Sequence, residues 1–336
     1  MATGVLPLTF LQLGKETTAG TAVVTTRELY PSPVGYFDPG VMVSHHEGSQ
    51  RGTFSNVTHG TVIGYRPTIG FASEPSTGLS FDDLVYPMSQ LASGLTGTGT
   101  LANKTWAASS AQTSHTFDTF TANLGSNQQA LEVEYCFATG FSISMGDQEG
   151  LTQWGMDLVG RQTTKVTVDT VAANNAVKVT NAAWTIKYAT AQSGLTGASA
   201  LANTLRSFSL DVVLPQRPQF YGDGNLYFGQ GLASENLGGT LTMVWDTTDD
   251  AEVQYDRMLT QSTSFFRLKN AGPTLGGGTY EVGIDVAVIW GPSGVKLNDG
   301  EIDGVSTTTL VGDIVYDSTW AEALLMDTVN SLSAVP

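Results

Sequence analysis

Residues 280–290 read Tyr-Glu-Val-Gly-Ile-Asp-Val-Ala-Val-Ile-Trp, so two kinds of side chain alternate along the segment. One set of positions is β-branched and apolar: Val282, Ile284, Val286 and Val288. The other set is acidic or small: Glu281, Gly283, Asp285 and Ala287. Because strand side chains point alternately to opposite faces, the pattern predicts a strand of roughly 35 Å, with one face on a core and the other in water. We expect its edges to stay open until neighbouring copies of the chain extend the sheet.

A second alternating segment covers residues 131–145. Its first apolar positions are Leu131, Val133, Tyr135 and Phe137, and the positions between them are Glu132, Glu134 and Cys136. Gly140 lies further along, where a glycine inside a strand indicates a β-bulge. Residues 152–160 and 305–316 are predicted to return beside the two long segments as further strands.

Two segments predict helices, at residues 78–92 and 248–260. In the first, Ser80 can cap the helix, and Asp82 and Asp83 fall in a first turn whose dipole favours negative charge. Pro87 predicts a kink or a break. An apolar stripe at helical spacing is formed by Phe81, Leu84, Val85, Met88 and Leu91. In the second helix Thr248 is the expected cap, and the predicted buried side contains Val253, Met258 and Leu259.

The order of elements predicts a mainly β chain with two related domains. Each half contains a strand, a helix with an Asp-Asp start, a long alternating strand and a return strand. We therefore expect a tandem duplication with domains at residues 1–190 and 191–336. Residues 30–52 carry Pro31, Pro33 and Pro39 and predict a surface loop, with the neighbouring His45 and His46 exposed rather than bound to metal.

The charge of the chain argues against several function classes. The 336 residues include 15 Lys and Arg against 31 Asp and Glu, a net charge of −16. Such a surface lacks the basic footprint of a nucleic-acid binder, although simple solubility explains the acidity equally well. One cysteine, Cys136, allows no disulfide within the chain, and a buried position is expected for it. No stretch is apolar for long enough to span a membrane, and the start of the sequence lacks the basic region of a secretory leader.

Motifs for chemistry are weak. Glu132 and Glu134 share a strand face at a separation of about 7 Å, which overlaps the range of glycosidase carboxylate pairs, but a solvated acidic strand face is the commoner arrangement. Acidic turns at residues 223–225 and 298–304 contain oxygen ligands suited to calcium. Asx-Gly pairs are first of all turn formers, so turns are expected there and no metal or other cofactor is predicted.

The opening of the chain carries the most specific pattern. Gly14-Lys15-Glu16-Thr17-Thr18 is followed by Gly20-Thr21-Ala22-Val23 and by Thr26-Arg27. This pattern resembles the opening of the major tail tube proteins of long-tailed bacteriophages, and Tyr316-Asp317-Ser318-Thr319 resembles their ending. Chain length, strand content and the order of elements agree with that resemblance over nearly the whole sequence.

The resemblance implies tandem tail-tube-type β-sandwich or barrel domains, each with one flanking helix, whose strands join those of neighbouring copies into a barrel around a channel. Rings of this family have six domains, so trimeric pseudo-hexameric rings or true hexamers are expected, and the rings stack. Other implied partners are the tape measure, tail terminator and distal tail proteins. Viral DNA would pass through without specific binding. The expected location is the virion tail, after assembly in the host cytoplasm.

From this we predict two sets of functional residues. The channel would be lined by acidic residues that repel DNA phosphates: Glu132, Glu134, Glu281 and Asp285. Contacts between rings would come from the opening segment: Gly14, Lys15, Glu16, Thr17, Thr18 and Arg27. Two alternatives remain open, namely a capsid-decorating or receptor-binding virion protein and a polysaccharide-acting β-sandwich enzyme.

Overall fold

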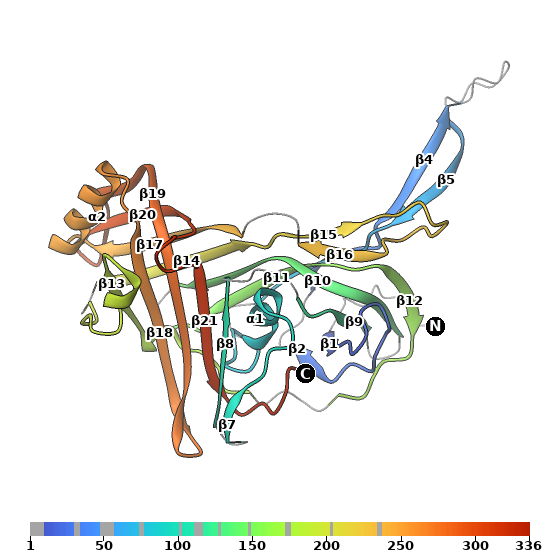
Figure 1. Cartoon of the computed structure of the whole chain (residues 1–336), viewed down its shortest axis with the longest axis horizontal. Helices are drawn as coiled ribbons and strands as arrows, with labels where there is room; N and C mark the ends of the chain where they lie inside the picture. Colours follow the sequence, from blue (N-terminus) through green and yellow to red (C-terminus); the bar gives the residue numbers. More distant parts are fainter. Residues whose placement is uncertain are drawn as a thin grey trace.

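The computed structural model of the chain describes residues 10–29, 34–47, 57–73, 77–100, 103–110, 117–126, 129–146, 149–171, 176–201, 204–233 and 237–336. Strands dominate this part of the chain, and it contains two α-helices, so the prediction of a mainly β protein is confirmed (Figure 1). The helices are α1 (Val85–Leu91) and α2 (Asp249–Leu259), and both begin within the segments predicted to be helical.

The strands of the first half are β1 (Phe10–Lys15), β2 (Arg27–Leu29), β3 (Val34–Asp38), β4 (Val41–Glu47), β5 (Val57–Tyr65), β6 (Thr68–Ala72), β7 (Thr98–Thr100), β8 (Asn103–Ser109), β9 (Phe120–Ser126), β10 (Gln129–Met145), β11 (Gln153–Val159), β12 (Gln162–Val166) and β13 (Trp184–Ala189). Those of the second half are β14 (Leu205–Val213), β15 (Gln216–Gln219), β16 (Gln230–Ala233), β17 (Gly238–Asp246), β18 (Ser264–Leu275), β19 (Gly278–Ile302), β20 (Val305–Ile314) and β21 (Leu324–Asn330).

A wide antiparallel sheet runs through the molecule in the order β3, β6, β11, β10, β14, β17, β20 and β19. Only the second half of β10 belongs to it. The first half of β10 lies in another sheet, between β9 and β12, and β1 and β2 continue that sheet beyond β9. Likewise, the first half of β19 lies between β18 and β21. The two longest strands therefore connect several sheets.

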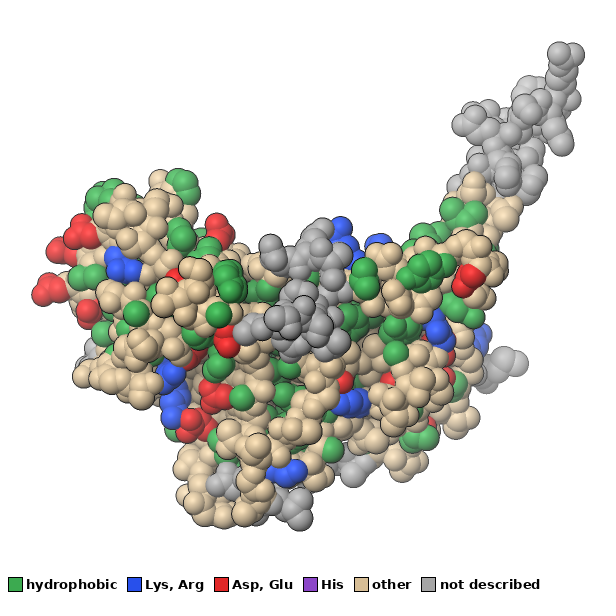
Figure 2. Space-filling view, viewed as in Figure 1, with side chains coloured by type: hydrophobic (Ala, Val, Ile, Leu, Met, Phe, Trp, Pro, Cys, Tyr) green, Lys and Arg blue, Asp and Glu red, His purple; other side chains and the backbone are tan. Residues whose placement is uncertain are grey.

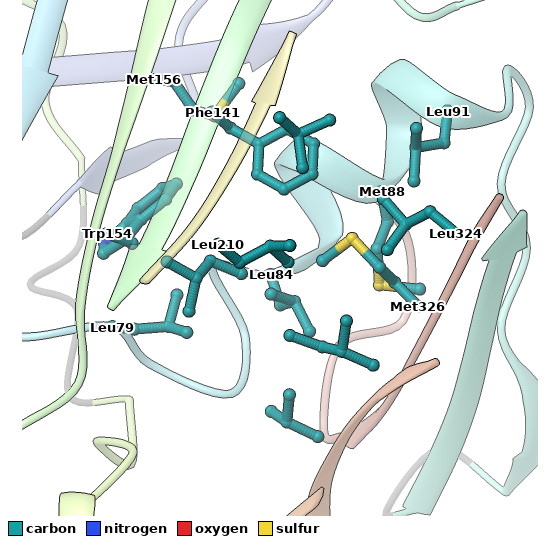
Figure 3. Close-up of a cluster of buried hydrophobic side chains, with 14 of the residues drawn as sticks. Leu79, Leu84, Met88, Leu91, Phe141, Trp154, Met156, Leu210, Leu324 and Met326 are labelled. Carbon is teal, nitrogen blue, oxygen red and sulfur yellow. The ribbon is translucent and has the colours of Figure 1, made fainter. Parts of the chain in front are cut away.

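One main hydrophobic core draws on both halves of the sequence, from Leu11 to Val335. Figure 3 shows Met88 and Leu91 of α1 in this core, together with Phe141 of β10 and Met326 of β21. Strands also pair across the predicted boundary at residue 190, since β13 pairs with β18, β10 with β14, and β8 with β21. The two halves thus share a core, and the tandem duplication stays a prediction.

The apolar face of residues 280–290 is confirmed, because Val282, Ile284, Val286 and Val288 are all fully buried. Two other expectations for this segment are wrong. Its edges are not open, since β18 pairs along one side and β20 and β21 pair along the other. The opposite face does not point to water at Asp285, whose side chain is buried. The segment is a central strand, so its edges cannot pair with a strand of a neighbouring copy.

The alternation of residues 131–145 breaks at Tyr135, which has a left-handed backbone with φ of 53°. The pairing of β10 with β9 shifts between Val133 and Cys136, so an extra residue reverses the faces that follow. Val133 and Cys136 consequently enter the main core, whereas Tyr135 and Phe137 enter a second cluster with Phe228. The expected burial of Cys136 is confirmed, and a further shift against β11 occurs next to Gly140, as predicted.

The two helices differ in environment, although each packs against the main core, α2 through Ala251 and Met258. Every residue of α1 is buried, and the acidic pair precedes the helix as a turn in which Ser80 Oγ accepts a hydrogen bond from the Asp83 amide at 3.1 Å. Helix α2 lies at the surface, where only Ala251 and Gln254 are buried. The predicted burial of Val253 and Leu259 is wrong, because no element covers that side of α2 in the described chain.

The predicted loop at residues 30–52 is wrong where the structure describes it. β3 pairs with β6, and β4 pairs with β5 as a hairpin that stands away from the body of the molecule (Figure 1). Residues 30–33 and 48–52 lie outside the described residues, as do the side chains of His45 and His46. The prolines predicted a surface position, but they do not prevent the intervening residues from pairing as strands.

Candidate functional site

The wide sheet has two chemically different faces. On β14, the side chains of Phe208, Leu210 and Val212 are buried against the core. The positions between them point the other way, and there Asp211 and Val213 are exposed. The same alternation occurs on β17 and β20, where Thr and Asp occupy most of the outward positions. We call this outward surface of β6, β11, β10, β14, β17 and β20 the open face.

The strand register aligns the residues of the open face into rows that cross the strands. One row crosses six strands and contains Asp313, Thr240, Asp211, Ser142, Gly155 and Ala72. The next row contains Val311, Thr242, Ser209, Ser144 and Gln153. A third contains Val213, Gly140, Asp157 and Gly70. The open face is therefore a surface of short side chains with carboxylates set among them.

The carboxylates of the open face are mostly exposed. Asp157, Asp211 and Asp313 all reach solvent. Ser209 Oγ donates to Asp211 Oδ2 at 2.9 Å, and Tyr36 OH donates to Asp157 Oδ1 at 3.3 Å. Burial and the Asp157 carboxylate raise the pKa of Tyr36, so the phenol remains protonated and keeps donating this hydrogen bond.

Basic groups are scarce beside these carboxylates. In the described strands β6, β11, β14, β17 and β20, the only Lys or Arg is Arg206. Its guanidinium binds Asp246 at two points, with distances of 2.6 and 3.0 Å, so one positive charge is neutralised by its neighbour. Lys296 of β19 is exposed at the margin of the face, opposite Thr309. The open face consequently carries net negative charge.

The four acids predicted to line a channel lie elsewhere, as two separate pairs. Glu132 and Glu134 are on the first half of β10, outside the wide sheet. Glu134 accepts hydrogen bonds from Nε and Nη2 of Arg161, at 2.8 and 2.5 Å. Glu132 is partly buried, and burial, reinforced by Asp169 and Glu134, raises its pKa. This pair is held by the surrounding structure and does not form an open acidic surface.

The second pair, Glu281 and Asp285, lies on the first half of β19. Asp285 binds Arg267 at two points and is buried, so the prediction that it faces an open channel is wrong for this chain. Glu281 is partly exposed and pairs with Lys269 at 2.6 Å. Because three of the four predicted acids are engaged in ion pairs, their charges are largely compensated. In the described part of the chain, Asp157, Asp211 and Asp313 of the open face form no such ion pair.

Most of the segment predicted to contact other rings is built into the fold. Gly14 is buried, and Lys15 pairs with Asp118 at 2.8 Å. Glu16 is buried and accepts hydrogen bonds from the amides of Gly20 and Tyr135 and from two threonine hydroxyls. Arg27 is nearly buried between Asp82 and Asp83, at 3.3 and 3.1 Å. Only Thr17 and Thr18 of the predicted contact set are exposed.

A cavity of about 1020 Å³ lies between this segment and residues 331–336. Arg27, Asp82, Lys15 and Asp118 line it as ion pairs, and neither Glu132 nor Glu134 reaches it. Burial raises the pKa of Asp82 even though Arg27 lies beside it. The glutamate pair proposed for a glycosidase is thus away from this cavity, and one of its members is bound to an arginine.

The open face was missed at the sequence level, although a signal for it exists. Residues 205–213, 238–246 and 305–314 alternate apolar residues with Ser, Thr and Asp, which is the pattern of a half-exposed strand. The turn at residues 223–225 is as predicted, since Asp223 Oδ1 accepts from the Asn225 amide at 3.1 Å. The turn predicted at residues 298–304 is confined to Asp303 and Gly304, which both have positive φ, because residues 298–302 belong to β19. In the part of the chain that the structure describes, no cluster of three or more potential metal ligands occurs.

Neither described helix has the length and apolar character needed to cross a bilayer. A scan against protein-family models finds no match, and a comparison with curated proteins finds no significant match.

Proposed function

We propose that the chain is a structural protein of a bacteriophage tail, which polymerises as stacked rings into a tube for the passage of DNA. The observation that carries the proposal is the open face, a wide sheet surface of short side chains and exposed carboxylates backed by a continuous core. The resemblance of residues 14–27 to the opening of tail tube proteins supports the same function. Asp157, Asp211 and Asp313 replace the originally predicted acids as the residues that line the channel.

The chemistry of the open face suits a wall along which DNA slides. Each base pair of DNA carries two phosphates, so a wall with unpaired Lys or Arg would retain the DNA through many weak ion pairs. Carboxylates repel phosphates over about a Debye length, roughly 8–10 Å at physiological salt. Ser, Thr and Gly side chains are short and leave the surface smooth. The wall therefore keeps DNA at a distance without binding it.

Ring closure would use strand edges that the single chain leaves unpaired. In the described residues, β3 pairs only with β6, and β12 pairs only with β10. Exposed edges of this kind readily accept a strand from another chain, and closure of a ring removes them. Three copies with two related halves, or six copies, would close the ring. Tape measure, terminator and distal tail proteins would then complete the tail within the virion.

The first test is electron microscopy of the purified protein over a range of concentrations. Stacked rings with a central channel are the expected result. A discrete oligomer that never polymerises would contradict the proposal and would favour a capsid-decorating or receptor-binding protein instead.

The second test asks which face lines the channel. In tubes that carry Asp211→Lys and Asp313→Lys, we expect linear DNA to be retained, with retention falling as salt concentration rises. Tubes of the wild-type chain should release the same DNA. Glu149→Lys with Asp223→Lys is the matched control, because it also reverses two acidic charges at exposed residues outside the open face. Equal DNA retention by the control and the open-face variant would exclude the open face as the wall.

A further inference from the structure

Two exposed apolar surfaces lie at opposite ends of the molecule (Figure 1). We call the first the projecting arm; it consists of the β4–β5 hairpin and the loop of residues 220–229 between β15 and β16. We call the second the α2 end; it consists of α2 and the tip of the β19–β20 hairpin, residues 296–306. Neither surface belongs to the open face.

The projecting arm exposes several large hydrophobic side chains: Val41, Val43, Ile63, Phe220, Tyr221 and Leu226. Hydrophobic side chains gather over the described part of this arm in Figure 2. The loop is fastened to β5, since the Tyr65 amide donates to the Leu226 carbonyl at 2.7 Å, and Phe228 is buried beneath it. A two-stranded hairpin is marginally stable alone in water, so an arm that exposes this much apolar surface is expected to pack on a partner.

The α2 end exposes a second apolar set: Val253, Tyr255, Leu259, Ile302 and Val305. The helix and the hairpin tip are adjacent, because the Thr247 amide donates to the Ser306 carbonyl at 2.9 Å just before α2 begins. Leu259 is 65% exposed although it occupies a position whose type and spacing predict burial. This side of α2 is therefore available to a partner.

Charge distinguishes the two surfaces. The α2 end carries a group of exposed acids: Asp249, Glu252, Asp256, Asp299, Glu301 and Asp303. Figure 2 shows acidic side chains concentrated there. Two α2 ends would repel each other, since Lys296 is the only exposed Lys or Arg in the described residues of α2 and the β19–β20 tip. The loop of the arm has the exposed acid Asp223, but the base of the arm has the exposed Arg66 and Arg217, so the arm meets less repulsion from the acidic end than a second α2 end would.

We propose that the projecting arm of one copy docks on the α2 end of a second copy. The contact is head-to-tail: it covers both the projecting arm and the α2 end with one interface and places Arg66 near acidic side chains. A head-to-tail interface leaves an unused arm at one end of a pair and an unused α2 end at the other, so it can build rings or filaments. The inference rests on the proposed function only in that both require copies of the chain to associate.

The test uses two full-length double variants, each damaging one surface. Val43→Ser with Ile63→Ser alters the arm, and Tyr255→Gln with Leu259→Gln alters the α2 end with residues that favour helix. Sedimentation velocity should show that each double variant weakens self-association by about tenfold or more relative to wild type. An equimolar mixture should form a 1:1 dimer, because the intact arm of one variant binds the intact α2 end of the other. The dimer should not grow, because its two remaining surfaces are the damaged ones. Val24→Ser, at a residue 71% exposed and outside both surfaces, should associate as wild type does.

Several results would overturn the inference. A wild-type chain that stays monomeric at every concentration would do so, as would mixed variants that remain monomeric. Persistent dimers of the α2-end variant alone would instead indicate contact between two arms. Tubes that form equally well from both double variants would refute the docking and leave the tail-tube proposal standing. Complementation between the variants without any tube in the wild-type protein would support the docking and refute the tube.

Discussion

Arg267 and Asp285 face each other across β18 and β19 and form a two-point ion pair, with distances of 2.6 Å from Nε to Oδ1 and from Nη2 to Oδ2. Gln192 also donates to the carboxylate, at 3.3 Å. The planar guanidinium matches both carboxylate oxygens, which allows a charged group to be buried on a strand whose other face is entirely apolar. Asp285, which the sequence pattern assigns to the solvent face, thus links β18 and β19 inside the protein.

Asp285→Asn should destabilise the protein strongly, because it removes the charge that Arg267 needs in a mostly buried site. We expect a loss of about 2–3 kcal/mol, below the full cost of breaking a buried pair since Arg267 keeps some solvent contact. Urea unfolding followed by tryptophan fluorescence measures the change. Glu281→Gln is the control: its pair with Lys269 is more exposed and should be worth less than about 1 kcal/mol. Equal losses in the two variants would contradict this interpretation.

Asp327 should make stability depend on pH in the opposite direction to an ordinary aspartate. Burial, together with Glu281 and Asp285, raises its pKa to about 6. The folded state therefore binds the proton more tightly than the unfolded state, so this group costs stability above its folded pKa and the cost disappears as pH falls toward about 4. Asp327→Asn should be more stable than wild type at about pH 7.5, by on the order of 2 kcal/mol, and the difference should shrink at about pH 4.5. Urea midpoints at both values test this, and a constant difference would argue against the assignment.

Arg27→Ala should lower the stability of the folded chain. The substitution leaves Asp82 and Asp83 buried without their cation, so a loss of about 3 kcal/mol or more is expected. Arg27→Lys should restore part of it, since a single ammonium cannot bind both carboxylates in the same way. Thermal unfolding provides the measurement. Thr18→Ala, at an exposed residue of the same segment, should unfold as wild type does; a similar loss there would point to the segment as a whole.

Cys136 should be inert in the folded protein. The thiol is fully buried, and burial, helped by the charge of Glu16, raises its pKa, so the reactive thiolate is scarce. We expect no alkylation by iodoacetamide in native buffer and complete alkylation in concentrated urea, as measured by mass spectrometry. Rapid labelling of the native chain would show that the main core opens near β10.

Local sequence patterns predicted strands, helices and burial correctly where these depend on residues close in sequence. The alternation of Val282, Ile284, Val286 and Val288 identified a core strand, and both helices begin within the predicted segments. They failed at Tyr135, because an inserted residue with positive φ reverses the faces of β10 without leaving a trace in the pattern. They also failed at residues 34–47, where the nearby prolines predicted a loop but the structure has two short strands.

The chain's own alternation of residues establishes that the protein is built of strands, and it identifies which positions prefer a core. Whether a polar position then meets water depends on the strand that lies beside it, and that strand comes from a distant part of the chain. Arg267 buries Asp285 and Arg161 engages Glu134, whereas β14, β17 and β20 come together to leave Asp211 and Asp313 exposed. The acidic surface is therefore a product of tertiary pairing, because burial and charge compensation are properties of neighbours in space.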